Sequence, residues 1–167
     1  MRPRLETVSL LSVAVIAFGL LTGCQASVAP AGKASTGSTA ASEDGTRAAA
    51  ARLQAFFVAW ASKDASALDS FIPPDHRGGA WEFEKVDRIE FGLITESPED
   101  VGAYMSGGAG NASGVERSDV RAFRASITYF YKPGSGGAME DGRPMDYLWF
   151  LERLPSGEWQ VSDWGYE

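Results

Sequence analysis

The sequence predicts an α+β domain in which N-terminal amphipathic helices pack on a curved antiparallel sheet of about four strands. Hydrophobic residues recur with helical spacing over 47–61, and from Trp81 onward the repeat changes to the period of two that is typical of strands. Turns rich in Gly and Pro join the later segments and favour hairpins between consecutive strands. Helices grouped before such strands indicate an α+β fold rather than alternating β-α-β units.

The first expected helix covers 47–61 and carries a continuous apolar stripe. Its members are Ala49, Leu53, Phe56, Phe57 and Trp60. Asp64 fits the N-cap of a second, shorter helix over 65–71, because its side chain can accept a hydrogen bond from the first turn. Pro73 and Pro74 are expected to end that helix, since proline lacks the N–H group and disfavours helix in the preceding residue.

The next part of the chain is expected to hold shorter elements. Alternation of apolar and polar residues predicts strand over 81–86 and 89–95. The Ser-Pro-Glu-Asp string at 97–100 favours the start of a turn or short helix that runs to about Met105, with proline at the first helical position. The Gly-rich segment 106–118 is expected to be a loop.

Three longer strands are expected at the C-terminal end. Segment 120–132 alternates most clearly, with Phe123, Ala125 and Ile127 on one face. Segment 145–154 is apolar on both faces, which predicts a central strand covered on both sides or a protein interface on its second face. A Pro-Ser-Gly-Glu turn separates it from a last strand over 159–166.

Composition excludes several functional classes. The chain has 167 residues, 15 Lys+Arg against 22 Asp+Glu and a net charge of −7. This length corresponds to one domain, and the acidic balance argues against nucleic acid as a partner. A single cysteine and a single histidine argue against a disulfide framework or a multi-cysteine metal centre. We therefore expect no metal and no cofactor.

The N-terminus carries a targeting pattern. Arg2 and Arg4 precede an uncharged, mostly apolar run over 8–21, which is too short at about 1.5 Å per residue to cross the roughly 30 Å of hydrocarbon. The run leads into Leu-Thr-Gly-Cys at 21–24, and this string resembles the lipobox of bacterial lipoproteins. The resemblance implies that residues 1–23 are a cleaved signal peptide and that Cys24 receives the lipid.

The segment that follows has the composition of a linker. Residues 24–46 are mostly Ala, Ser, Thr and Gly and include no aromatic residue, so they are expected to form a flexible tether. The folded domain is expected over 47–167. Acylated Cys24 would anchor it to the lipid bilayer on the extracytoplasmic face of a bacterial membrane, because acyl chains bury many methylene groups. Whether that membrane is inner, outer or single is left open.

Two strings in the domain resemble a known family. The sequence FFVAWASKD at 56–64 and the sequence WQVSDWGY at 159–166 are similar to motifs of small bacterial lipoproteins. The C-terminal domain of those lipoproteins has no assigned function and belongs to the cone-shaped nuclear-transport-factor-2-like, or SnoaL-like, superfamily. The resemblance implies a concave sheet that wraps the long helix, with a pocket at the open end, and it implies no activity.

Candidate site residues follow from that expected pocket. The side chains expected to line it are Trp60, Tyr129, Tyr131, Tyr147 and Asp163. Alternation puts Asp163 on the same face as Trp159 and Val161; on a concave face it would be a buried base, and otherwise it would bond to the neighbouring backbone. Core packing is the alternative for the tyrosines. The single histidine, His76, is expected in a solvated loop, and no catalytic residue is assigned.

Three functional hypotheses remain. The first is a membrane-anchored lipoprotein, more a binding module than an enzyme, whose domain binds a small apolar ligand, a peptide or an envelope protein. The second is a cone-fold hydrolase, isomerase or dehydratase that uses Asp163 with a tyrosine. The third is an interaction module without a pocket, in which the second face of 145–154 forms a homodimer or binds a partner.

Overall fold

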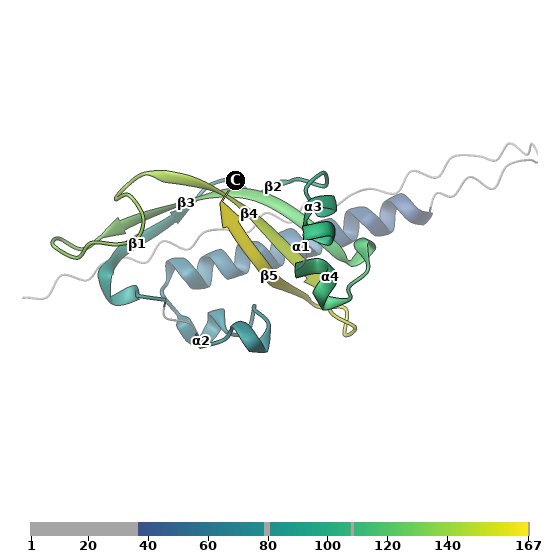
Figure 1. The fold of residues 1–167 in the computed structure, drawn as a ribbon, viewed down its shortest axis with the longest axis horizontal. Helices are drawn as coiled ribbons and strands as arrows, with labels where there is room; N and C mark the ends of the chain where they lie inside the picture. The colour runs from purple at the N-terminus through teal and green to yellow at the C-terminus, as the bar shows by residue number, and fades with distance from the viewer. Residues whose placement is uncertain (1–36, 79–80, 108, 167) are drawn as a thin grey trace, which may run out of the picture. The chain divides into compact units, whose positions relative to one another are not determined.

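The computed structural model describes residues 37–78, 81–107 and 109–166, and its ribbon is shown in Figure 1. It has an α+β fold, as predicted: a curled antiparallel sheet is combined with a long helix and several short helices. The expected signal peptide, Cys24 and the first part of the tether lie outside the described residues.

The long helix α1, Gly37–Ala61, begins well before the expected start at Arg47. The last part of the segment expected to be a tether is therefore helical. Its Thr46 hydroxyl donates to Glu96 Oε1 at 2.9 Å and accepts from Arg121 Nε at 3.1 Å, so it docks against the sheet region. Periodicity could not reveal this turn of helix, because small and polar residues form no apolar stripe.

The sheet has five strands, and its main path runs β1-β3-β4-β5 with β2 paired to β3. The strands are β1 Val86–Phe91, β2 Thr95–Glu96, β3 Val120–Tyr131, β4 Pro144–Arg153 and β5 Trp159–Tyr166. All pairings are antiparallel, and the three long strands follow one another as hairpins. In the β4–β5 turn, Gly157 has a φ of +89°, which favours glycine, and its N–H donates to the Leu154 carbonyl.

One face of the sheet packs on α1 and forms the main core. Trp149 of β4 is 0% exposed and meets Phe57 of α1 edge-on, with ring centroids 4.9 Å apart. Phe57 also stacks on Phe91 of β1 at 4.0 Å. The face expected for 120–132 is confirmed, because Phe123 and Ile127 lie in this cluster. Aromatic side chains thus fill the space between helix and sheet, where edge-to-face pairs add to the burial term.

Short elements connect α1 to the sheet. Helix α2, Ala65–Leu68, ends sooner than expected, but its predicted N-cap is confirmed: the Ala67 N–H donates to Asp64 Oδ1 at 3.0 Å. A 3₁₀ helix, Pro74–His76, follows the two prolines. A second 3₁₀ helix, Phe83–Lys85, stands where sequence alternation predicted strand, so the strand begins only at Val86.

Helices α3, Val101–Gly107, and α4, Ala109–Ser113, belong to the opposite face of the sheet. Tyr104 of α3 stacks on Phe150 of β4 with centroids 4.3 Å apart, within a second apolar cluster that includes Val120. The two apolar faces of β4 are therefore both covered inside this chain, which is the first of the two alternatives left by the sequence. Helix α4 lies within the segment that was expected to be a loop.

A polar anchor holds the start of α3. Arg124 of β3 donates from Nη2 to Asp100 Oδ2 at 2.7 Å, and the Ser97 hydroxyl donates to the same carboxylate at 2.5 Å. These hydrogen bonds, from Ser97 first and then from Arg124, hold the pKa of Asp100 below its usual value. The anchor fixes where α3 crosses the sheet and therefore where Tyr104 lies.

Candidate functional site

The side chains expected to line a pocket are dispersed in the structure. Trp60 and Tyr147 are 6% and 7% exposed and pack in the aromatic core. Tyr129 stacks on Tyr131 with ring centroids 5.9 Å apart, at the end of β3. The concave face that was expected to hold a pocket is thus occupied by the protein's own rings.

A β-bulge places Asp163 on the face opposite to the one predicted. In the pairing of β4 with β5, Phe150 lies opposite Asp163 and Leu151 lies opposite Val161, so Ser162 is an extra residue. Beyond the bulge the alternation is shifted. Trp164 packs in the main core, while Asp163 shares the face of Phe150. The assignment of Asp163 to the face of Val161 was therefore wrong.

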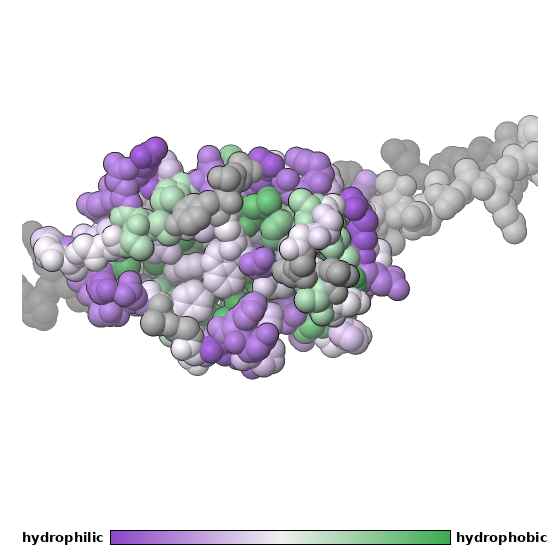
Figure 2. Space-filling view, viewed as in Figure 1, coloured by the Kyte–Doolittle hydropathy of each residue, from purple (hydrophilic) through white to green (hydrophobic). Residues whose placement is uncertain are grey.

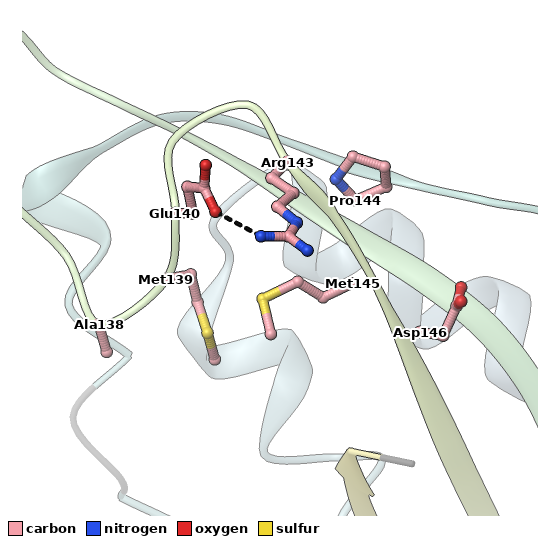
Figure 3. A pocket seen from close by; sticks show the side chains of 7 residues that line it. All are labelled: Ala138, Met139, Glu140, Arg143, Pro144, Met145 and Asp146. Atoms are coloured by element: carbon pink, nitrogen blue, oxygen red, sulfur yellow. Dashed lines mark hydrogen bonds and ion pairs between the residues drawn. The ribbon is translucent and has the colours of Figure 1, made fainter.

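A cavity beside the β3–β4 connection is lined by residues of that loop and by the first residues of β4. It has a volume of about 530 Å³ and includes the ion pair in which Arg143 Nη1 donates to Glu140 Oε2 at 2.7 Å. Figure 3 shows Met139 from the loop and Met145 from β4 extending into the same space. Glu140 and Arg143 are paired with each other, and Asp146 is the third charged side chain of the lining.

A second cavity, on the face of α3 and α4, brings together titratable and polar side chains from distant segments. It has a volume of about 370 Å³, and we call it the Glu152 cavity. Its lining residues are Pro73, Asp75, His76, Tyr104, Ala112, Ser113, Glu152, Gln160 and Ser162. In the same orientation as Figure 1, Figure 2 shows hydrophilic residues around the margin of the molecule and paler ones toward the centre.

Glu152 is the centre of this cavity. It lies near the end of β4, directly after an apolar run that ends at Leu151, and is only 6% exposed. Its Oε1 accepts a hydrogen bond from the Tyr104 hydroxyl at 2.9 Å and another from the Ser113 hydroxyl at 2.7 Å. Its Oε2 receives no hydrogen bond from the residues that the structure describes. Every buried side-chain oxygen and nitrogen in the described part of the chain has a hydrogen-bond partner, so Oε2, which has none, is reached by solvent and is open to a ligand.

Tyr104 supports the carboxylate. Burial, together with the neighbouring Glu152 carboxylate, raises the pKa of the Tyr104 phenol well above its usual value, although the contact with the Ser162 hydroxyl acts in the opposite direction. The phenol therefore stays neutral and donates its proton to Glu152. The Ser162 hydroxyl lies 3.1 Å from the Tyr104 oxygen and also donates to the Phe150 carbonyl at 3.2 Å. Bulged Ser162 thus extends the network along β5.

His76 lines the same cavity, from the 3₁₀ helix after α2. Its side chain is 50% exposed, and its Nε2 lies 3.9 Å from Asp75 Oδ2. The expectation of a solvated histidine is consistent with this exposure, but the expectation gave no sign that His76 would share a cavity with Glu152. Folding brings the two together because the segment after α2 packs at β5, where the Val161 N–H donates to the Phe71 carbonyl at 2.8 Å.

Sequence reasoning missed Glu152, Tyr104 and Ser162. The one available signal was a charged residue that directly follows an apolar run in a strand predicted to be covered on both faces. Nothing in the sequence could say that α3 and α4 would cover that residue, because the Gly-rich stretch predicts a loop.

Comparison of the chain with family models, curated proteins and solved structures finds no match. In the described part of the chain, no group of three or more His, Cys, Asp or Glu side chains is arranged to hold a metal ion. Across the same described residues, no helix combines the length and the apolar character needed to cross a bilayer.

Proposed function

We propose that this chain is an extracytoplasmic lipoprotein, anchored through acylated Cys24, whose α+β domain binds a small polar ligand in the Glu152 cavity. The observation that carries the ligand site is a carboxylate that is 6% exposed, held by Tyr104 and Ser113, with its second oxygen left without a hydrogen bond among the described residues. A few convergent polar groups in a cavity of about 370 Å³ are typical of small-molecule sites.

The aromatic core supports a polar rather than an apolar ligand. Trp149 and Phe56 are both 0% exposed, and their rings pack edge-to-face at 6.1 Å. An apolar guest between α1 and the sheet would have to displace such contacts, and protein interiors are close-packed. A sheet curled about a long helix is also consistent with the cone fold of the nuclear-transport-factor-2-like superfamily, which we propose as the family.

The cover on β4 supports a binding module over a homodimer formed through this strand. Phe150 is 8% exposed and lies under the ring of Tyr104, so the second face of 145–154 offers little apolar surface there. The partners we propose are therefore the lipid bilayer, through Cys24, and a small ligand in the Glu152 cavity.

A second candidate function is acid–base catalysis at the same site. His76 and Glu152 line one cavity with Tyr104, and His and Glu are common proton-transfer groups. A hydrolase, isomerase or dehydratase would use Glu152 as the base, the role that the sequence analysis considered for Asp163. Turnover of a bound ligand by the wild-type chain, lost on Glu152→Gln, would favour this candidate over simple binding.

The anchor is tested with a fatty-acid label in a bacterial host. We expect the full chain to incorporate the label and to fractionate with membranes, and a Cys24→Ser variant to do neither. Cys24 is the only cysteine, so no other thiol can take the acyl group. A Cys24→Ser chain that is still processed and membrane-bound like the wild type would refute the lipid anchor.

The ligand site is tested by a thermal-shift screen of small polar compounds against the full chain. A compound that binds the folded state raises its melting temperature by mass action. We expect the shift to disappear in Glu152→Gln and to persist in Glu158→Gln, an exposed residue of the β4–β5 turn with the same change in charge. A screen without hits, or hits indifferent to Glu152→Gln, would count against the site.

A further inference from the structure

The side chains hydrogen-bonded around Glu152 present acceptors rather than donors to the cavity. The Tyr104 and Ser113 hydroxyls both donate to Glu152 Oε1, at 2.9 Å and 2.7 Å. The Ser162 hydroxyl donates to the Phe150 carbonyl at 3.2 Å. Each of these hydroxyl hydrogens thus has an acceptor within the protein, so Glu152 and its hydroxyl partners offer a ligand only lone pairs, those of Oε2 included. The side-chain N–H donors of the lining are those of the Gln160 amide and the His76 ring.

The charged residues that line the cavity also favour a cationic ligand. Glu152 and Asp75 line it, His76 is the one lining residue that can become cationic, and neither Lys nor Arg is among its described lining residues. Asp163 acts on Tyr104 electrostatically from the same face. The low dielectric around a buried carboxylate strengthens attraction for a cation and repulsion of an anion.

We propose that the Glu152 cavity binds the primary ammonium or guanidinium group of a small organic cation, which donates an N–H to Glu152 Oε2. This inference rests on the proposed function and names the ligand class of the same site. Ammonium and guanidinium groups carry donors and no acceptors, so they complement a cavity that offers acceptors. The Gln160 side chain, at the margin of the cavity, supplies a further carbonyl acceptor.

Two other cations fit less well. A metal ion needs several anionic or imidazole ligands, and the described residues hold no cluster of three. A quaternary ammonium has no N–H and is recognised by aromatic faces. The ring of Tyr104 is already stacked on Phe150 at 4.3 Å, so one of its faces is taken.

The test is a titration of the full chain, purified in non-ionic detergent, by calorimetry and by backbone-amide NMR. The probes are n-butylamine hydrochloride and agmatine, compared with n-butanol, sodium butyrate and tetramethylammonium chloride. We expect both amines to bind and to shift the amides of Glu152, Ser113 and Gln160. The neutral, anionic and quaternary probes are expected to leave those amides unchanged.

Glu152→Gln is the decisive variant. Its amide oxygen can still accept from Tyr104 and Ser113, while its NH₂ replaces the acceptor Oε2 with a donor. We expect amine affinity to fall at least ~10-fold, as loss of a hydrogen bond to a charged group implies. The matched control Glu158→Gln changes the net charge equally at an exposed turn and is expected to keep wild-type affinity.

A second variant keeps the carboxylate in place in case Glu152→Gln does not fold. Gln160→Leu removes the whole side-chain amide, with its carbonyl acceptor and its N–H donors, and is expected to weaken amine binding by ~3-fold or more. Binding of butyrate or butanol at this cavity would overturn the cation inference and leave the binding module intact. Amide signals that shift on amine addition only at other residues, or no amine binding at all, would also overturn the cation inference. The lipid-label experiment on Cys24 is independent of all these outcomes.

Discussion

The two faces of the sheet differ in the side chains that cover them. The face toward α1 is filled by rings such as Trp149, which is 0% exposed and packs among other buried aromatic side chains. The face toward α3 and α4 has a small apolar cluster around Phe150 and, next to it, a buried carboxylate with hydroxyl partners. Dense apolar packing stabilises the fold, and the thinly covered face leaves room for a ligand.

The largest effect on stability is expected from a substitution on the α1 face of the sheet. Trp149→Ala removes a fully buried indole and leaves a cavity that its neighbours cannot fill, so we expect a loss of about 3–5 kcal/mol in the free energy of unfolding. Urea denaturation measures it. Leu93→Ala, at a side chain that is 90% exposed, is the control and should change stability by less than about 0.5 kcal/mol. Similar losses for the two variants would contradict the assignment of the core.

Tyr104→Phe should have a smaller effect on the other face. The ring still stacks on Phe150, but Glu152 Oε1 loses one of its two donors. We expect a loss of about 1–2 kcal/mol by urea denaturation, because a buried charged acceptor is left less satisfied. Tyr131→Phe, at a residue whose hydroxyl accepts a long hydrogen bond from the Met139 N–H at 3.4 Å, serves as the tyrosine control. A loss of unfolding free energy as large as that of Trp149→Ala would contradict the view that the two faces contribute differently to stability.

The anchor of α3 should show a pH-dependent effect. Because the pKa of Asp100 is lowered in the folded state, its contribution to stability is present above the unfolded carboxyl pKa and is lost as pH falls through the folded value. Asp100→Asn should therefore destabilise at neutral pH, by less than about 1 kcal/mol for a solvent-screened pair, and the difference from wild type should shrink in acid. Denaturation series at several pH values measure it, and a gap that widens in acid would refute the anchor.

The smallest signal is spectroscopic. Because the pKa of Tyr104 is raised, its phenolate forms at a higher pH than the phenolate of an exposed tyrosine. Stability should then fall as pH rises above the unfolded tyrosine value, because the unfolded state ionises first. Phenolate absorbance of the wild type minus that of Tyr104→Phe isolates this residue. A difference that titrates at the ordinary tyrosine pH in the folded protein would show that Tyr104 is not buried.

The sequence predicted the α1 face better than the face of the cavity. The stripe that includes Leu53 and Phe56 is visible in spacing alone, and both side chains are 0% exposed in the core. Alternation along 120–132 likewise placed Ile127 correctly. Burial that repeats with a regular period leaves a mark in the sequence, because each element must turn one side to the core.

Prediction failed where the chain departs from a regular period. The bulge at Ser162 moved Asp163 to the other face, and alternation cannot register an unpaired residue. Glu152 looked like a defect in an apolar strand, because its partners come from α3 and α4, far along the chain. A site assembled from single polar residues on separate elements has no spacing to detect.

The bulge residue Ser162 in β5 also bears on how the sequence of this domain can evolve. Ser162 stands outside the one-to-one ladder, so Val161 and Trp164 keep their inward places whether or not it is there. Deleting that single codon would straighten the strand, remove one hydroxyl beside Tyr104 and leave the aromatic interior as it is. Natural variation at this point can therefore alter the lining of the proposed ligand site while the aromatic core is preserved.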